Sequence, residues 1–309
     1  MGPAGRPHPV SAASAALALR RPNALAGIAL TVGASACFAA LDTTTKYVSA
    51  SVPLLMALWV RYLFQAVATT AVMMPARGWQ IWRTRRLAWQ LVRGVLLLAS
   101  SLLAFLSLRY MPVGEFTAIV MITPLVITLL AATLLKEHVS PLRWVLVAGG
   151  FAGTLVIIRP GASHFGWSSL LPLALVGCNS AFQVLTSKLA QTEDPVTMHL
   201  YTGWTGTLIA SLALPFVWTA LPSPWLWAGL AFMGLMASVG HFMLILAYYR
   251  APAATLTPYL YTQIGFAMLG GMIVFSHLPD RLSLAGMGMI AVCGAAGAWL
   301  TVRERRLAE

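Results

Sequence analysis

Ten stretches of this chain are each long and apolar enough to cross a membrane as a helix. A spanning helix needs about 20 predominantly apolar residues. Of the 309 residues, 59% are apolar and only 9% are charged. We therefore predict an all-α membrane protein of ten transmembrane helices. They are expected at Ala24–Tyr47, Leu54–Pro75, Trp89–Leu108, Val113–Leu135, Leu142–Ile158, Trp167–Leu189, Val196–Thr219, Trp225–Tyr249, Ala251–Phe275 and Leu282–Val302.

The basic residues predict which way these spans face. Counted by alternate loops, fifteen Lys and Arg residues lie on one side, Arg93 among them, and four lie on the other. The positive-inside rule then places both chain ends in the cytoplasm, with residues 1–23 and 304–309 as cytoplasmic tails. The net charge of +12 is thus a topology signal and does not indicate nucleic-acid binding. We expect a multi-pass protein of the bacterial cytoplasmic (inner) membrane.

The sequence also contains a weak internal repeat. A shift of 142 positions aligns Lys46 with Lys188 and Pro53 with Pro195. Farther along, a shift of 140 positions aligns Pro112 with Pro252. Span 1 then matches span 6, and so on to spans 5 and 10. Since each half has five spans, the halves 24–160 and 161–303 must enter the membrane from opposite sides, as in inverted-repeat transporters.

The run from Leu108, "LRYMPVGEFTAIVMITPLVITLLAATLLKEHVSPLRWVLVAGGFAGTLVIIRPG", resembles span 4, its loop and span 5 of the EamA family in the drug/metabolite transporter superfamily. The resemblance extends over about residues 24–303. It implies a central cavity walled by spans 1–4 and 6–9, with spans 5 and 10 peripheral. Where the family usually has Gly-Glu after span 4, this chain has Lys136-Glu137, which puts a loop contact in question.

Three charged residues fall inside the outer half of the predicted spans: Asp42, Arg61 and Glu115. Charges in the hydrocarbon are costly, so such residues are functional candidates by default. On one interpretation, Arg61 meets a substrate carboxylate while Asp42 or Glu115 gains and loses a proton. On the other, Arg61 forms a permanent ion pair with one of these carboxylates that holds spans 1, 2 and 4 together.

Three further polar residues lie within spans. His241 in span 8 is a candidate proton carrier, because histidine titrates near neutral pH; alternatively it hydrogen-bonds a neighbouring helix. Asn179 and Gln183 lie one turn apart on span 6, where amides either bind solute or join helices.

Aromatic residues recur at matching places in the two halves. Trp59 and Tyr62 lie on span 2, and Tyr201 and Trp204 lie on span 7, each pair on one helix face. This pattern fits two walls of a cavity that bind a flat solute, but Trp and Tyr also gather at membrane interfaces.

Span 9 carries a deeper set of polar residues, Tyr259, Tyr261 and Gln263. Pro258 precedes them and predicts a kink, because proline lacks the backbone donor of a regular helix. We expect Tyr259 and Gln263 to line the cavity, and Tyr261 to do so only if the register changes.

The leading functional hypothesis is a secondary transporter that works by alternating access and exports small organic metabolites such as amino acids or their derivatives. The alternative is an importer of a vitamin or nucleobase-like heterocycle of the riboflavin type. A membrane-embedded transferase is disfavoured because no HExxH, paired-aspartate or GxSxG motif occurs, so we expect no enzyme activity. The expected partners are a small-molecule substrate, protons and membrane lipid, in a monomer or homodimer. No cofactor or metal is predicted, and Cys37, Cys178 and Cys293 are interpreted as packing residues.

Overall fold

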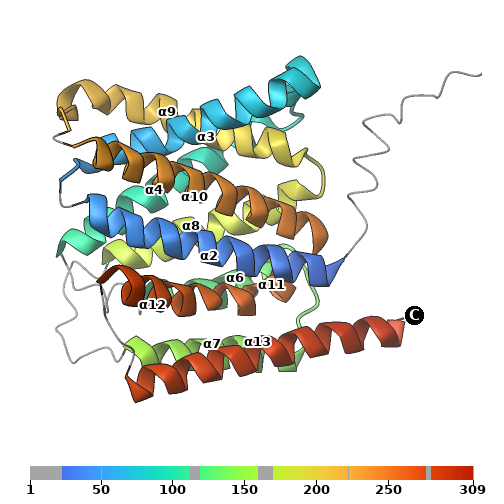
Figure 1. Cartoon of the computed structure of the whole chain (residues 1–309). Helices are drawn as coiled ribbons and strands as arrows, with labels where there is room; N and C mark the ends of the chain where they lie inside the picture. The colour runs from blue at the N-terminus through green and yellow to red at the C-terminus, as the bar shows by residue number, and fades with distance from the viewer. Residues whose placement is uncertain are drawn as a thin grey trace, which may run out of the picture.

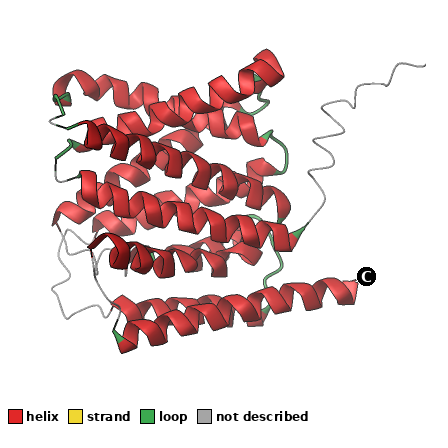
Figure 2. Cartoon of the chain, in the orientation of Figure 1, coloured by secondary structure: helices red, strands yellow, loops and turns green. Residues whose placement is uncertain are grey.

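The computed structural model describes residues 23–49, 51–110, 119–158, 170–221, 223–275 and 280–308. Every regular element within these ranges is helical (Figure 2). Seven of the described helices are long and apolar enough to cross a membrane, and α6 and α7 are shorter apolar helices. The elements are α2 (Ala24–Val48), α3 (Leu54–Arg77), η1 (Gly78–Trp82), α4 (Leu87–Tyr110), α6 (Thr123–Leu134), α7 (Pro141–Ile158), α8 (Leu170–Ala190), α9 (Pro195–Val217), α10 (Pro224–Arg250), α11 (Ala253–Leu260), α12 (Thr262–Phe275) and α13 (Arg281–Ala308).

The ten predicted spans fall on these helices in order, with differences at spans 9 and 10. Span 9 is divided between α11 and α12. The last helix continues to Ala308 rather than ending at Val302, so the segment expected as a tail is mostly helical. The predicted tail 1–23 lies outside the described residues except for Asn23, whose side chain accepts a hydrogen bond from the Ala26 amide and caps α2.

The helices of the first half pack on those of the second (Figure 1). The main pairs are α2 with α10, α4 with α8, α3 with α9, and α7 with α13. The predicted repeat relates α2 to α8, α3 to α9, α4 to α10 and α7 to α13. When each helix is replaced by its counterpart, the same four pairs result. The α3–α9 pair is antiparallel, because Trp59 early in α3 bonds Ser211 late in α9, and Thr70 near the end of α3 bonds Trp204.

The pair α7 and α13 lies along one edge of the bundle (Figure 1). Glycines bring the two helices close together. A Cβ built on Gly153 would lie 2.9 Å from the carbonyl oxygen of Gly286, and one on Gly149 would lie 2.7 Å from the Cys293 sulfur. Small residues let helices approach in this way in membranes. The edge position agrees with the peripheral role expected for spans 5 and 10.

Span 9 is broken close to Pro258, as the sequence predicts. α11 ends at Leu260 and α12 begins at Thr262. Pro258 cannot donate to the carbonyl of Ala254, four residues earlier. The Thr257 hydroxyl donates to that carbonyl instead, at 3.3 Å, and also contacts the Thr128 hydroxyl of α6 at 2.9 Å. The freed backbone group is therefore satisfied from within the protein, which membrane helices require.

Span 4 has a break at the corresponding place. Residues 119 and 120 are helical, 121 and 122 form a turn, and α6 starts at Thr123. The shift of 140 positions that aligns the halves carries Met121 to Tyr261, where span 9 is interrupted. Discontinuous helices at equivalent positions are typical of transporter folds built from two repeats.

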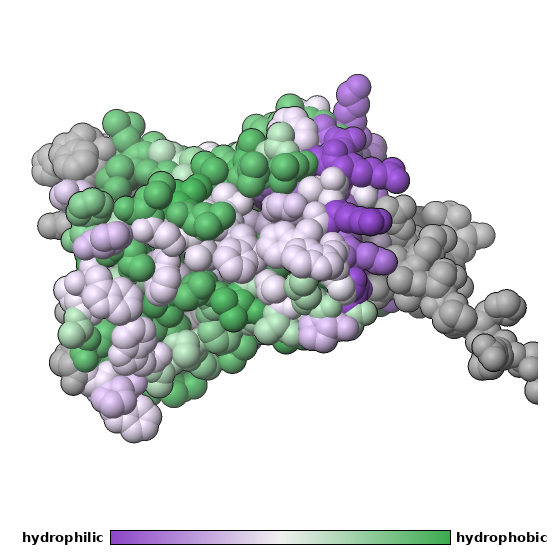
Figure 3. All heavy atoms as spheres, turned by 90° about the horizontal axis from the view of Figure 1, so that it is seen from above, coloured by the Kyte–Doolittle hydropathy of each residue, from purple (hydrophilic) through white to green (hydrophobic). Residues whose placement is uncertain are grey.

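Hydrophilic side chains gather at one end of the molecule (Figure 3), the end at which the C terminus lies in Figure 1. Several contacts join loops there. Arg77 forms an ion pair with Asp194 at 3.0 Å. Glu193 accepts hydrogen bonds from the Thr84 hydroxyl at 2.7 Å and the Arg85 amide at 3.3 Å. This is the end that the count of basic residues assigns to the cytoplasm.

Candidate functional site

Arg61 and His241 meet in the interior of the bundle, where both side chains are buried. The Arg61 guanidinium on α3 donates from Nη2 to Nε2 of His241 on α10, at 3.1 Å. Nη1 lies 3.4 Å from the Ser101 hydroxyl on α4. Because Nε2 accepts, a neutral His241 carries its proton on Nδ1. Neither this Nδ1 nor Arg61 Nε has a hydrogen-bond partner in the described part of the chain. Two buried donors are thus available to an acceptor.

Aromatic rings flank His241 on two sides. The Phe38 ring on α2 lies 4.8 Å from the imidazole, centroid to centroid. The Phe182 ring on α8 lies 5.9 Å from it, edge-on. Tyr62, next to Arg61, is fully buried, and its hydroxyl contacts the Ser101 hydroxyl at 3.1 Å. The donors therefore lie among flat apolar surfaces supplied by several helices.

A second histidine, His199 on α9, is joined to the same helices. Gln65 on α3 donates its amide to the His199 carbonyl at 3.0 Å and to its Nδ1 at 3.3 Å. His199 Nε2 therefore carries the proton and donates to the Ser238 hydroxyl on α10, at 3.0 Å. Gln65 lies one turn from Arg61, and Ser238 lies one turn from His241. Hydrogen bonds between buried polar side chains therefore join α3, α9 and α10.

Arg93 on α4 is buried, which the sequence does not predict. The sequence places it among the loop charges of the cytoplasmic side, but its exposed fraction is 0%. Its Nη1 donates to Gln90 at 3.1 Å and to the carbonyl of Met198 at 3.0 Å. Its guanidinium lies 5.4 Å from the Phe182 ring centre. Arg93 and His199 are the ionisable residues of this region that the sequence analysis does not identify as interior, and the polar residues Gln65, Gln90, Ser101 and Ser238 are likewise absent from it.

The predicted ion pair of Arg61 does not form with Asp42. Asp42 on α2 accepts a hydrogen bond from Gln263 of α12 at 2.8 Å, and its side chain is exposed. Glu115 lies outside the described residues. The other carboxylates with described side chains bind elsewhere: Glu137 and Asp280 at helix starts, and Glu193 and Asp194 in the loop contacts given above. Among the described side chains none of these carboxylates forms an ion pair with Arg61 or Arg93, although Asp42 is close enough to Arg61 to interact with it electrostatically.

Asn179 and Gln183 share one face of α8, as predicted from their spacing. The Gln183 amide donates to Asn179 at 3.1 Å, and the Tyr248 hydroxyl of α10 donates to the Gln183 oxygen at 2.6 Å. The chain of bonds joins α8 to α10. It occupies part of the hydrogen-bonding capacity that both amides would need for a solute.

The matching aromatic pairs do not face one another. Trp59 donates to Ser211 and lies edge-on to Trp218 at 6.1 Å. Tyr201 and Trp204 instead contact Trp82 of η1, which follows the opposite end of α3. The Tyr201 hydroxyl donates to the Trp82 carbonyl at 2.9 Å. Because α3 and α9 are antiparallel, equivalent positions on them lie toward opposite ends of the pair.

Tyr259 and Tyr261 point toward the edge helices. Tyr261 is fully buried against Gly150 of α7, where an added Cβ would lie 2.6 Å from its ring. The Tyr259 hydroxyl lies 3.0 Å from a Cβ built on Gly297 of α13. Gln263, by contrast, points to Asp42 on α2. Of the three polar residues singled out in span 9, only Gln263 contacts one of the candidate charges.

Comparison with known proteins identifies the fold and its family. The family model of the EamA-like transporter family matches residues 25–159. A riboflavin transporter of Rhizobium johnstonii is 30% identical over 209 residues, covering 65% of this chain and 67% of that protein. The chain belongs to the EamA-like transporter family. A solved crystal structure shares the fold of this EamA-like transporter, with a TM-score of 0.76 at 21% identity, covering 92% of this chain and 99% of that one.

Two further relatives of this EamA-like transporter are named for riboflavin and for S-adenosylmethionine. A riboflavin transporter of Vibrio cholerae is 27% identical, covering 88% of this chain and 93% of that protein. An S-adenosylmethionine uptake transporter of Rickettsia conorii is 25% identical, covering 81% and 84%. The protein is therefore a small-molecule transporter of the drug/metabolite transporter superfamily, not an enzyme, and spans the bacterial inner membrane several times.

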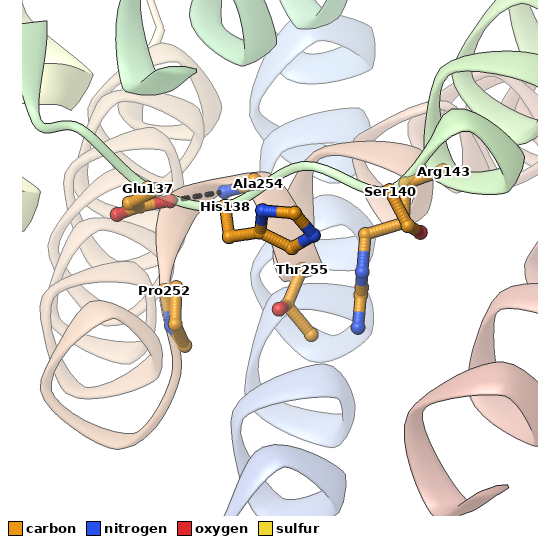
Figure 4. A pocket seen from close by; sticks show the side chains of 7 residues that line it. All are labelled: Glu137, His138, Ser140, Arg143, Pro252, Ala254 and Thr255. Atoms are coloured by element: carbon orange, nitrogen blue, oxygen red, sulfur yellow. Dashed lines mark hydrogen bonds between the residues drawn. The ribbon is translucent and has the colours of Figure 1, made fainter. Parts of the chain in front are cut away.

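A pocket of about 360 Å³ lies away from the Arg61–His241 contact, at the loop between α6 and α7 (Figure 4). One wall carries Glu137, whose carboxylate accepts hydrogen bonds from the Ala253 and Ala254 amides at 3.2 and 2.9 Å. The loop contact questioned from the sequence is thus present in this EamA-like transporter. Lys136 adopts a φ of 55°, a left-handed conformation that glycine takes without cost and that explains the family's usual Gly at this place.

Proposed function

We propose that this transporter carries a flat, acceptor-rich heterocycle of the riboflavin class, and that it works in the direction of uptake. The observation that carries the proposal is the Arg61–His241 pair, which leaves two buried donors unused between the Phe38 and Phe182 rings. Several relatives of similar length are named riboflavin transporters, and others S-adenosylmethionine uptake transporters.

The chemistry of the pair suits such a solute. Flavin rings are flat and present ring nitrogens and carbonyl oxygens as acceptors. A guanidinium and an imidazole N–H donate in fixed directions, and aromatic faces stack on flat rings. Buried donors without partners discriminate strongly between solutes, because a solute that lacks the matching acceptor leaves them unsatisfied. Arg61 and His241 are therefore the proposed binding residues, with Tyr62 and Ser101 holding Arg61 in place.

Transport is proposed to follow alternating access between two inverted halves, 24–160 and 161–303. The set of helix pairs that is unchanged on exchange of the halves supports this, as do the interruptions of spans 4 and 9 at equivalent positions. The hydrophilic end of the molecule (Figure 3) is proposed to face the cytoplasm, because the count of basic residues predicts that both chain ends lie on that side. The halves would rock about the α3–α9 crossing, next to which Arg61 lies.

Export of an amino-acid derivative is the second candidate, and one observation favours it. Asp42 is an exposed carboxylate within α2 that accepts a hydrogen bond from the neutral amide of Gln263. A solute ammonium group bound there and a carboxylate bound to Arg61 would recognise an amino acid at both ends. A pseudopaline exporter of Pseudomonas aeruginosa is 24% identical, covering 86% of this chain. On this alternative Asp42, with Glu115 or His241, also carries the coupled proton.

Counterflow in proteoliposomes tests both candidates. Labelled riboflavin and a panel of labelled amino acids are offered to vesicles preloaded with the same unlabelled solute. The heterocycle proposal expects protein-dependent riboflavin counterflow that falls by about ten- to hundredfold in Arg61→Gln and in His241→Leu, the size expected for a lost charge-assisted bond. Arg86→Gln, which removes an exposed loop charge, is the matched control and is expected to transport normally.

One outcome of the same experiment would contradict the heterocycle proposal. Amino-acid counterflow without riboflavin counterflow, abolished by Asp42→Asn, would replace uptake of a heterocycle with the export hypothesis. An imposed pH gradient then tests whether transport is coupled to protons. Accumulation that depends on the gradient in the wild type but not in Asp42→Asn assigns the coupling to that carboxylate.

A further inference from the structure

Arg93 is a buried cation with unused donors. Its side chain is 0% exposed, and its Nε and Nη2 have no hydrogen-bond partner among the described residues. The amide nitrogen of Gln90, whose oxygen accepts from Arg93, is likewise buried and without a partner in that part of the chain. Three buried donors on two residues one turn apart, close to the cytoplasmic end of α4, thus lack a partner, and no carboxylate with a described side chain binds there.

A structural role accounts for only part of this arrangement. Arg93 Nη1 holds the carbonyl of Met198 on α9, and a neutral amide would make the same bond. A guanidinium sealed from water without a counter-charge is strongly disfavoured, so its burial indicates an anionic partner. Nε and the neighbouring nitrogen of an arginine lie in one plane and match the two oxygens of a carboxylate or phosphate.

The position of Arg93 is separate from that of Arg61. Arg61 lies seven residues into α3 and Arg93 six residues into α4, and the two helices run in opposite directions. The two residues are therefore each about 10 Å from opposite ends of the bundle. The Phe182 ring stands between them, with Arg93 5.4 Å from its centre and His241, the partner of Arg61, 5.9 Å from it.

From this geometry we infer that Arg93 and Gln90 form a second binding site, on the cytoplasmic side of Phe182, that takes an oxyanion: a phosphate or carboxylate group. The group is either part of the transported molecule or a free anion. A solute carrying such a group would bind its ring at Arg61–His241 and its anion at Arg93, on the two sides of one phenylalanine. The role in transport rests on the proposed function, but binding of the anion does not.

Inorganic phosphate is the first probe, because it needs no transport substrate. The thermal unfolding midpoint of the purified protein is measured against phosphate concentration, with sodium chloride at matched ionic strength as the reference. We expect a saturable rise of roughly 2–4 °C at a concentration tenfold above the dissociation constant. The rise should vanish in Arg93→Gln and persist in Arg61→Gln, the matched loss of the other buried arginine.

A second arm identifies the source of the anion. Riboflavin 5′-phosphate is tested as an inhibitor of riboflavin counterflow in the wild type and in Arg93→Lys, which keeps the charge but lacks the planar pair of donors. Inhibition at least tenfold weaker in Arg93→Lys shows an anion borne by the solute. A phosphate effect on stability without such inhibition shows a free anion. Arg93→Lys also serves in the first arm if Arg93→Gln does not fold.

The inference is overturned if inorganic phosphate leaves the unfolding midpoint unchanged and riboflavin 5′-phosphate does not inhibit counterflow. It is also overturned if both effects are the same in the Arg93 variants as in the wild type. A phosphate effect that disappears in Arg61→Gln alone would place the single anion site at Arg61. Absence of riboflavin counterflow together with an Arg93-dependent phosphate shift would remove the proposed substrate and leave the oxyanion site in place.

Discussion

Gly203 on α9 touches the backbone of Ala66 on α3: a Cβ built on Gly203 would lie 2.9 Å from the Ala66 nitrogen and 3.0 Å from its Cα. These atoms belong to a helix backbone and have no room to move. We therefore expect Gly203→Ala to destabilise the protein by about 1–3 kcal/mol through overpacking. The thermal unfolding midpoint of the purified variant measures the loss.

Gly177→Ala on α8 is the matched control, because nothing lies within 4 Å of the added Cβ. That substitution should be neutral or stabilising by up to about 1 kcal/mol, since alanine is the better helix former. An equal gain from both substitutions would show that α3 and α9 are not in close contact in the membrane.

The hydroxyl of Thr257 replaces the backbone hydrogen-bond donor that Pro258 lacks. Thr257→Val keeps the shape but leaves the Ala254 carbonyl and the Thr128 hydroxyl with fewer partners. The expected cost is about 1–3 kcal/mol, the penalty for a buried polar group left unsatisfied. Thr133→Val, which removes a similar hydroxyl bond at an exposed position, should change stability by less than about 0.5 kcal/mol. Equal effects of the two variants would refute this account of the kink.

Lys136 has a left-handed backbone that a side chain disfavours. Lys136→Gly should therefore stabilise the protein by about 0.5–1 kcal/mol, the relief of strain less the added flexibility of the unfolded chain. Lys136→Ala removes the charge but not the strain and should bring no gain. The comparison of their unfolding midpoints separates conformation from charge, and a gain in the alanine variant would assign the effect to charge.

Asp194 has two roles that a pair of variants can separate. Its Oδ1 accepts from the Val196 and Thr197 amides at the start of α9, and the carboxylate pairs with Arg77. Asp194→Asn keeps the cap and should cost less than about 1 kcal/mol, the usual worth of an exposed ion pair. Asp194→Ala loses the cap as well, at about 1 kcal/mol more. The gap between wild type and Asp194→Asn should shrink in high salt.

The positions of the spans could be predicted from the sequence, because the length of an apolar stretch and the placement of proline are local properties. The sequence also located the break near Pro258 and the interior positions of Arg61 and His241. What it could not give was the set of contacts between helices. The shift of 142 positions aligns Trp59 with Tyr201, but because their helices pack antiparallel, Trp59 contacts Trp218 and Tyr201 contacts Trp82.

Arg93 shows a different limit. A basic residue about two turns inside a span, near its cytoplasmic end, has the same sequence signal as one that reaches the interface. Only the packing of α4 against α9 reveals that Arg93 is buried. The spacing of Gln90 and Arg93 at i and i+3, a polar stripe on an otherwise apolar span, was the one local sign available.

The glycine contact between α7 and α13 also constrains how the protein is made. α7 ends at Ile158, and its partner begins only at Arg281. At about 5–20 residues per second, the ribosome needs several more seconds to synthesise the roughly 120 residues between them. Throughout that time the Gly149–Gly153 face of α7 lacks the helix that covers it in the folded protein. Assembly of this edge therefore waits for the last helix to leave the insertion machinery, and a chain cut short before α13 would leave the first half without its final neighbour.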